Sequence, residues 1–393
     1  MVYFSIPQLP SEINTFCSGR MINTATMGLY IHIPFCHSKC LYCDFYSLKS
    51  GDLIEPYVEI LHKQLTDMAK RYSGYTLESI YFGGGTPTAI GAGHLCGLLG
   101  QIKAVFPLLP DCEISLEANP NSIDYAGMAQ LRTSGFNRIS FGVQSAVDSE
   151  LEQLGRTHSS KDAEQVIHWA RNAGFENISM DLMMGIPGQT LDSLQQSLSF
   201  AAAQKVQHIS AYLLKIEEGT PYYRMQHQLA LPDDDRQSDF YLAGVEYLAR
   251  MGYAQYEISN FALPGFPCRH NLVYWNCGEY LGLGPSAHSF LRGTRFYYPR
   301  NLLGYLGYQQ PVSDGEGGSL AEYCMLRLRL AEGIIFTDAM RRGMTQEQAK
   351  AMRRGAESLA ANQLCVTGQE KIALTPKGFL LSNLCTSYLL DLL

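Results

Sequence analysis

Short apolar stretches alternate along this chain with longer stretches in which apolar residues recur at helical spacing. The short stretches predict strands and the longer ones predict helices. We expect strands at residues 28–34, 79–82, 113–117, 138–141, 178–182 and 208–213. We expect helices among them at residues 55–72, 94–106 and 161–173. Alternation of this kind predicts a parallel sheet with right-handed crossovers, and six such units predict an α/β fold, a partial (β/α)6 barrel open on one side.

The rest of the chain predicts an extension and a second domain. The barrel and its extension take residues 27–303, including a helical segment at 233–251 and an aromatic-rich stretch up to 299. Residues 304–319 are rich in glycine and predict a linker. Residues 320–393 read as helix, helix, hairpin and helix, with the hairpin at 364–375 turning at Gly368 and Gln369, which predicts a winged-helix-like appendage. Residues 1–26 predict an irregular leader, in which Met21 is one alternative start and Met27 follows directly as another.

Net charge, cysteine content and the length of apolar runs give no support for a nucleic-acid-binding, secreted or membrane-spanning protein. The formal net charge of −7 gives no electrostatic reason to expect nucleic-acid binding. The arginines at 341, 342, 353 and 354 are therefore better explained as a solvated helix face. Eleven cysteines without a secretory signal indicate a reducing compartment, and we expect a cytoplasmic protein. No apolar run reaches about 18 residues, so we expect no transmembrane segment.

Cys36, Cys40 and Cys43 form a CxxxCxxC motif directly after the first predicted strand. Four thiolates would close a structural metal site, whereas three leave one iron of a [4Fe–4S] cluster open to a small molecule. A zinc site and three unrelated buried cysteines are the alternatives. A zinc site calls for a second Cys/His pair about 12–20 residues further on, and none follows.

The run YIHIPFC-x3-C-x-YC-DF resembles the radical S-adenosylmethionine (SAM) family, and within it the oxygen-independent coproporphyrinogen oxidase group. The resemblance implies a [4Fe–4S] cluster held by the three cysteines. It also implies that the open iron binds the amino and carboxylate groups of SAM. One electron from the cluster would then cleave SAM to methionine and a 5′-deoxyadenosyl radical.

Further residues match the SAM site of this family in the family's order. The glycine run YFGGGTPT follows the second predicted strand, where glycine lets the backbone approach a ligand closely. An acceptor carboxylate suits ammonium or ribose groups, and an arginine suits a carboxylate. Taken singly, each residue could equally be a turn, a cap, a surface group or part of the core. The resemblance assigns the following residues to SAM binding: Tyr30, Gly84, Gly85, Thr86, Glu117, Gln144, Arg156 and Asp181.

Two features separate this chain from the decarboxylating oxidases. The first feature is Phe45. The decarboxylating oxidases have a fourth cysteine two residues after the third, and this chain has Phe45 at that position. The second feature is the run His270-Asn271-Leu-Val-Tyr274-Trp275, an HNxxYW pattern. Both features resemble the haem chaperone (HemW-type) branch, in which the HNxxYW pattern is linked to haem binding.

His270 is the expected haem ligand or haem-orienting residue, since an imidazole ligates haem iron and aromatic side chains offer apolar walls. The alternative is an aromatic core in which a backbone carbonyl satisfies His270. Weaker candidate ligands are His288, His32, Cys268 and Cys277.

Three functions follow from these resemblances. The first is a haem chaperone that delivers haem to haem-dependent respiratory proteins, with haem, an accepting apoprotein and an electron donor as partners. The second is an oxygen-independent coproporphyrinogen III oxidase. The third is a related radical SAM methyltransferase. Haem binding without turnover favours the first, and a tetrapyrrole or methylated product favours the others.

Overall fold

The computed structural model describes residues 25–49 and 51–393. The predicted leader, apart from its last two residues, lies outside these ranges. In the described part of the chain, one twelve-stranded sheet dominates, with the order β14-β13-β12-β11-β1-β4-β5-β6-β7-β8-β10-β9. Its edges are β14 and β9, so the sheet does not close on itself.

The centre of this sheet is the predicted barrel. Six neighbouring strands run parallel to one another. They are β1 (Ala25–Ile33), β4 (Tyr75–Gly84), β5 (Leu108–Ala118), β6 (Arg138–Gln144), β7 (Asn177–Met184) and β8 (His208–Leu213). Each overlaps one predicted strand. Every residue of β6 is buried, as expected of a parallel strand covered on both faces. The partial (β/α)6 barrel is therefore confirmed.

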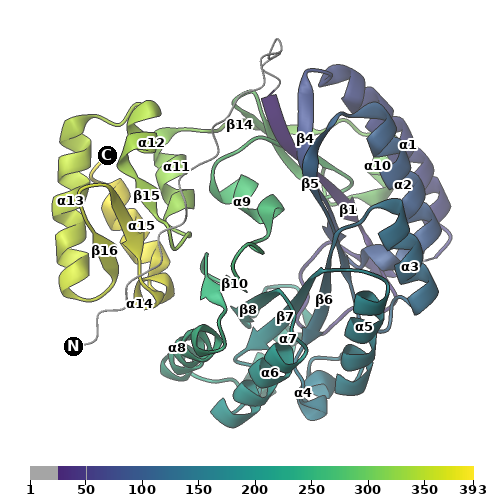
Figure 1. The fold of residues 1–393 in the computed structure, drawn as a ribbon, viewed down its shortest axis with the longest axis horizontal. Coiled ribbons are helices and arrows are strands. Elements are labelled where there is room, and N and C mark those ends of the chain that lie inside the picture. The colour runs from purple at the N-terminus through teal and green to yellow at the C-terminus, as the bar shows by residue number, and fades with distance from the viewer. Residues whose placement is uncertain (1–24, 50) are drawn as a thin grey trace.

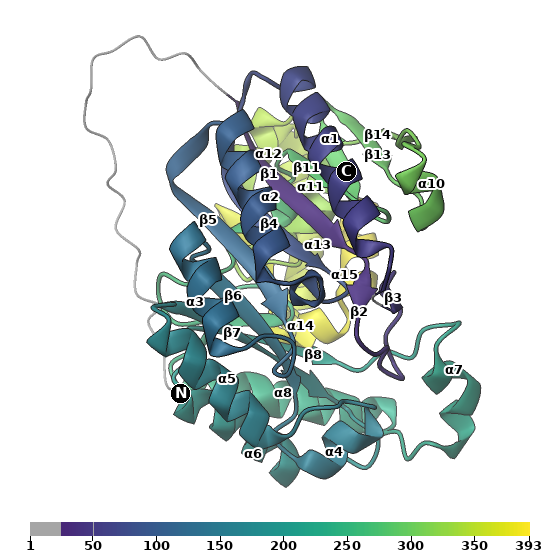
Figure 2. The same ribbon diagram turned by 90° about the vertical axis from the view of Figure 1, so that its right-hand side faces the viewer.

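Helices cover the outer face of the curved sheet (Figures 1 and 2). They are α1 (Ile54–Arg71), α2 (Ala92–Val105), α3 (Tyr125–Ser134), α4 (Asp148–Gln153), α5 (Ser160–Asn172), α6 (Leu191–Ala203) and α8 (Asp234–Arg250). Capping boxes begin α5 at Ser159 and α6 at Thr190, where each hydroxyl accepts from a backbone N–H inside the first turn. The helices predicted at 55–72 and 94–106, now α1 and α2, begin without a side-chain cap, so apolar periodicity is the signal that all three predicted helices share.

Short elements complete this part of the molecule. They are β2 (Phe35–Cys36), β3 (Leu48–Lys49), the 3-10 turns η1 (Pro87–Ile90) and η2 (Gln226–Gln228), α7 (Pro221–Met225), β9 (Ala254–Gln255), β10 (Asn260–Ala262) and α9 (Arg269–Trp275). Helix α9 lies between the curved sheet and the appendage (Figure 1). The sheet then continues past β1 through β11 (Tyr280–Leu283), β12 (His288–Leu291), β13 (Thr294–Tyr297) and β14 (Val312–Glu316).

The glycine-rich segment at 304–319 is not a plain connection. It contains most of α10 (Leu302–Leu306) and the whole of β14, which pairs antiparallel with β13. All five residues of β14 are exposed, and the strand contains Gly315, one of the glycines on which the linker prediction rested. The linker prediction is corrected to this extent, and the outer limits of the domains stay a prediction.

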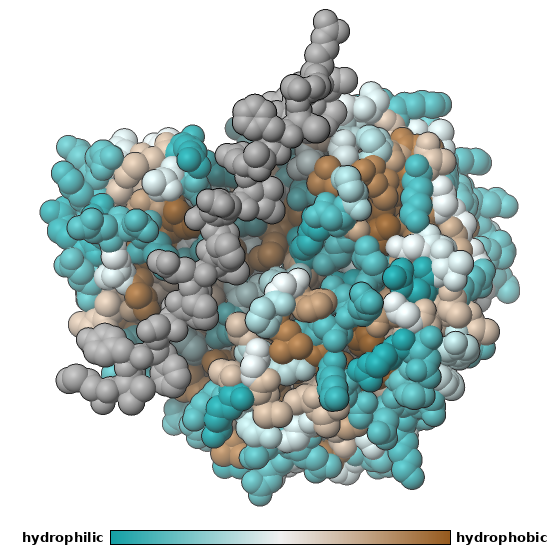
Figure 3. All heavy atoms as spheres, viewed as in Figure 1, coloured by the Kyte–Doolittle hydropathy of each residue, from teal (hydrophilic) through white to brown (hydrophobic). Residues whose placement is uncertain are grey.

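The C-terminal appendage contains the predicted helices and hairpin, together with a short strand, β15, and additional short helices that were not predicted. Its elements are α11 (Leu320–Arg327), β15 (Ile334–Ile335), α12 (Phe336–Arg341), α13 (Gln346–Ala361), β16 (Cys365–Thr367), β17 (Lys371–Leu374), α14 (Pro376–Leu380) and α15 (Ser382–Leu390). The hairpin β16–β17 forms where it was predicted, and Gly368 N–H donates to the Lys371 carbonyl at 3.0 Å. In the space-filling view, hydrophilic side chains dominate the outer rim of both the appendage and the barrel (Figure 3).

Several of the arginines in the appendage have partners within it. Arg341 pairs with Asp338 at 2.7 Å, Arg342 lies 4.5 Å above the ring of Tyr323, and Arg353 lies 5.1 Å above that of Phe336. Among the described residues, no helix is both long and apolar enough to cross a membrane.

Candidate functional site

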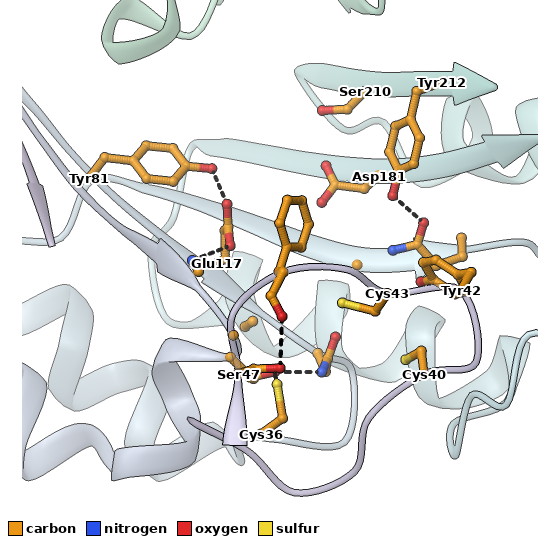
Figure 4. Close-up of a pocket in the computed structure, with 18 of the residues that line it drawn as sticks. Cys36, Cys40, Tyr42, Cys43, Ser47, Tyr81, Glu117, Asp181, Ser210 and Tyr212 are labelled. Atoms are coloured by element: carbon orange, nitrogen blue, oxygen red, sulfur yellow. Dashed lines mark hydrogen bonds between the residues drawn. The ribbon is translucent and has the colours of Figure 1, made fainter. Parts of the chain in front are cut away.

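A cavity of about 490 Å³ opens at the carboxyl ends of the parallel strands, where folds of this kind place their sites. All the residues assigned from the sequence to the cluster and to SAM line it, together with the main haem candidate. These residues are Tyr30, Cys36, Cys40, Cys43, Gly84, Gly85, Thr86, Glu117, Gln144, Arg156, Asp181 and His270. The thiols approach from a loop, and Glu117, Asp181 and Tyr212 face them from strands (Figure 4).

Cys36 ends β2, Cys40 and Cys43 lie on the loop between β2 and β3, and all three are free thiols. The Sγ of Cys36 lies 3.4 Å from the hydroxyl of Thr86, and Arg156 Nη1 donates to the Sγ of Cys40 at 3.3 Å. Burial raises the pKa of the Cys43 thiol to about 11. Among the described residues, no other cysteine lines the cavity.

This donor set suits a cluster better than a single ion. Within residues 25–49 and 51–393, no three His, Cys, Asp or Glu side chains gather around one metal position. A [4Fe–4S] cluster takes each thiolate on a different iron, so its ligands need not converge on one point. Three free thiols on one loop, with the cavity in front of them, fit a cluster that keeps one iron open.

The glycine run after β4 is shaped by close packing against the cysteine loop. Gly84 has φ +111°, and a Cβ there would come within 2.6 Å of the His32 ring. A Cβ on Gly85 would lie 2.6 Å from the carbonyl oxygen of Phe35. The N–H groups of Gly85 and Thr86 donate to the carbonyls of Ile33 and Phe35 at 2.9 and 2.8 Å. Only glycine permits this approach, which joins the predicted SAM-binding run to the base of the cysteine loop.

Glu117, at the end of β5, is the most perturbed carboxyl group of the cavity. Its Oε1 accepts from the hydroxyl of Tyr81 at 2.8 Å, and its Oε2 accepts from Gly84 N–H at 3.3 Å. Burial, with the nearby Asp181 as a second cause, raises the pKa of Glu117 to about 7. Perturbed carboxyl groups in clefts are candidates for binding sites.

Asp181 and Gln144 line the cavity from the neighbouring strands β7 and β6. Burial raises the pKa of Asp181, and Ser140 donates to its Oδ1 at 3.0 Å. Gln144 has φ +72°, at an irregularity in the pairing of β6 with β7. A non-glycine residue in this region is strained, and such strain often marks a functional site. Tyr212 donates to Gln144 Oε1 at 2.9 Å, which holds the amide at the cavity wall.

His270 occupies the other end of the cavity and is 1% exposed. Its Nδ1 lies 2.8 Å from the hydroxyl of Ser79, and its Nε2 lies 2.7 Å from the hydroxyl of Tyr274. Burial lowers the pKa of His270 to about 3, and Arg138 adds to this. Both ring nitrogens therefore have hydroxyl partners, rather than the backbone carbonyl considered from the sequence.

The weaker haem-ligand candidates do not line this cavity. His32 contacts the Tyr30 hydroxyl through Nδ1 and the Tyr46 carbonyl through Nε2, and burial lowers its pKa to about 4. His288 is exposed on β12 and stacks on Tyr297 at 5.2 Å. The Sγ of Cys268 donates to Glu113 at 3.6 Å, and Cys277 is buried.

Sequence reasoning missed several residues of the cavity. They include Tyr42, Tyr81, Asn119, Ser210, Tyr212, Ser259 and Asn260. Most of them lie at or near the carboxyl end of a strand, and that position was the only signal that could have found them. Asn119 illustrates the use of such residues, because it accepts from Arg156 at 2.7 Å and donates to Thr86 at 2.9 Å.

Comparison with known proteins agrees with this geometry. Residues 30–201 match the model of the radical SAM superfamily. The heme chaperone HemW of Mycobacterium tuberculosis is 34% identical over 370 residues, which cover 91% of this chain and 93% of that protein. HemW of Escherichia coli is 36% identical over 324 residues, which cover 79% of this chain and 85% of that protein.

This chain belongs to the HemW family. Membership of the radical SAM superfamily implies a [4Fe–4S] cluster and SAM as cofactors, and the donor set described above fits both. Among solved structures, the coproporphyrinogen III oxidase HemN of Escherichia coli superimposes with a TM-score of 0.80 at 22% identity. The match covers 94% of this chain and 91% of HemN. At that identity the likeness shows a shared fold, the partial barrel with its appendage.

Proposed function

We propose that this chain is a haem chaperone that acts in the cytoplasm. It holds a [4Fe–4S] cluster and SAM in the cavity, binds haem and delivers it to haem-dependent apoproteins such as those of respiration. Its partners are haem, the accepting apoprotein and an electron donor for the cluster. The observation that carries the proposal is that a single cavity gathers all twelve predicted residues in a chain similar to proteins named heme chaperone HemW.

Within this proposal, Cys36, Cys40 and Cys43 hold the cluster, which in the radical SAM family supplies one electron to SAM. Arg156 is suited to the carboxylate of SAM. Glu117 and Asp181 are suited to its ammonium or ribose hydroxyl groups. The backbone around Gly84 and Gly85, the Thr86 hydroxyl, the Gln144 amide and the Tyr30 ring line the remaining walls.

His270 is the proposed haem ligand or haem-orienting residue. For its Nε2 to ligate iron, the hydroxyl of Tyr274 must first turn away, because the two atoms lie 2.7 Å apart. Haem binding at His270 would therefore exchange the hydrogen bond to the Tyr274 hydroxyl for a bond to the haem iron.

Absorbance spectroscopy of anaerobically purified protein tests the proposal. We expect the broad band of the cluster, and a sharp Soret band that saturates at one haem per chain. Transfer of that haem to an apoprotein should then move the Soret band to the position of the acceptor. Failure to bind haem, with the cluster intact, would overturn the chaperone function.

A second assay separates the proposal from the oxidase alternative. Phe45, in the place of the oxidases' fourth cysteine, lines the cavity with an apolar ring that neither ligates iron nor relays a proton. We therefore expect no protoporphyrinogen IX from coproporphyrinogen III, with SAM and a reductant present and the cluster intact. Product formed over several turnovers would restore the oxidase hypothesis, and a methylated product would favour the methyltransferase.

A further inference from the structure

The size of the cavity raises the question of where a haem would lie. Ligand cavities in proteins span about 300–1,000 Å³, and about 490 Å³ lies toward the lower end of that range. This volume suits one ligand of the size of SAM, and SAM with a complete haem exceeds it. Because the proposed cluster shares this space with SAM, a complete haem beside them needs further surface outside the cavity.

Phe45 offers an apolar surface at the mouth of the cavity. It lines the cavity, and 69% of the residue is exposed. Its carbonyl accepts from Lys39 Nζ and from the hydroxyl of Ser47, each at 3.4 Å. The backbone is thus anchored while the ring has no buried position, which is unusual for a large aromatic side chain.

A second exposed apolar side chain lies on a segment that is bonded to the side chain of Tyr46, the residue after Phe45. The N–H of Leu302 donates to the hydroxyl of Tyr46 at 2.8 Å, so the start of α10 lies against the residue that follows Phe45. Leu303, the next residue, is 70% exposed. Phe45 and Leu303 are among the most exposed large apolar residues of the described chain.

Two cations flank these apolar side chains in a chain whose net charge is −7. Lys39 is exposed and lines the cavity. The side chain of Arg300 is 58% exposed and lies 3.4 Å from Asp44, which neutralises part of its charge. We call Phe45, Leu303, Lys39 and Arg300 together the mouth platform. An apolar surface with cations beside it is complementary to a flat apolar ring that carries carboxylates.

We infer that haem binds on the mouth platform, with its macrocycle against Phe45 and Leu303 and its propionates toward Lys39 and Arg300. The inference rests on the proposed function and deepens it, because it names the surface that holds the macrocycle. The platform holds the ring and its carboxylates while SAM fills the cavity, and ligation of the haem iron by His270, inside the cavity, belongs to a state without SAM. It also places haem beside the cysteine loop, outside the space needed by SAM.

Titrations of the full chain with two probes test the platform. Haem carries both propionates, and haem dimethyl ester has the same ring without their charge. Phe45→Ser and Leu303→Ser should each weaken binding of both probes several-fold to tenfold, because apolar contact area is lost. Lys39→Glu should weaken haem binding about tenfold and leave binding of the ester nearly unchanged.

Matched controls lie on distant elements. Leu384, on α15, is 66% exposed, and Lys161, on α5, is exposed as well. Leu384→Ser and Lys161→Glu should bind haem like the wild type. Phe45 and Lys39 lie close to the cysteines in the sequence, so iron analysis checks that their variants keep the cluster. Leu303 lies on another segment, so Leu303→Ser tests the platform without a change in the cysteine loop.

The outcomes separate the inference from the proposed function. A wild-type chain that binds no haem overturns both. A wild type that binds haem, together with platform variants that bind it equally well, overturns the platform and leaves the chaperone function standing. Equal effects of Lys39→Glu on haem and on its dimethyl ester would overturn the assignment of the propionates.

Discussion

The two ends of the cavity are built in opposite ways. At the cysteine loop, three thiols face the cavity, and two of them make only long contacts to a hydroxyl and a guanidinium. At the other end, His270 is bonded on both ring nitrogens, and Glu117 accepts from two donors. Weak sulfur contacts cost little to exchange for iron, whereas short bonds to nitrogen and oxygen must be broken before those groups can bind anything.

A second buried histidine, His208, has the same kind of hydrogen-bond partners as His270. His208 lies between the hydroxyls of Ser179 and Tyr256, each at 2.8 Å. This is the same Ser–His–Tyr arrangement as at His270, yet His208 does not line the cavity. The arrangement by itself is therefore a way to satisfy a buried imidazole. His270 differs from His208 in lining the cavity and in belonging to the HNxxYW pattern, and these two features make it a candidate for haem.

The largest effect is expected at the cysteine end. Replacing Cys36, Cys40 or Cys43 with Ala removes a protein ligand from a second iron, so cluster content should fall severely and SAM cleavage should be lost. Iron and sulfide analysis after reconstitution measures this. Cys96→Ala is the matched control, since Cys96 is also a free thiol but lies on α2 away from the cavity. Full iron content in all three variants would refute the cluster assignment.

The next effect compares the two histidines. His270→Ala and His208→Ala should each lower the free energy of unfolding by about 2–4 kcal/mol, because each removes a buried ring together with its hydrogen bonds to two hydroxyl groups. Denaturant unfolding measures both losses. If the sequence-based proposal holds, only His270→Ala also weakens haem binding or shifts the Soret band, and both variants keep the cluster. An unaltered haem titration in His270→Ala would move the ligand to another residue.

The smallest effect concerns Glu117 and pH. Its pKa is about 7 in the folded protein and 4.5 as an ordinary carboxyl group, so the folded state binds this proton more tightly. The resulting stability is present in full below pH 4.5 and is lost as the pH rises to about 7. Glu117→Gln should therefore raise stability at pH 8 by about 1–3 kcal/mol and flatten the pH profile of the melting temperature. A variant as pH-dependent as the wild type would contradict this assignment.

The sequence by itself determined the main strands and helices of the barrel, and that the motif residues lie together in one site. Apolar periodicity is a local property, so the six parallel strands and the three helices predicted among them appeared near their predicted positions. Residues that follow successive parallel strands must meet at one edge of the sheet. The motif residues at positions 30–181 therefore line one cavity, although the resemblance named them only one by one.

Only the tertiary structure decided which partners those residues have and how far they are buried. Ser79 and His270 are 191 positions apart, and their bond exists because α9 packs against β4. The raised pKa of Glu117, the left-handed backbone of Gln144 and the exposure of Phe45 likewise depend on neighbours from other elements. The strand β14 within the predicted linker has the same origin, because its sequence is hydrophilic and its strand conformation comes from pairing with β13. The local pattern of apolar residues specifies a strand or a helix. The burial and the hydrogen-bond partners of a side chain are set by the other elements that pack against it.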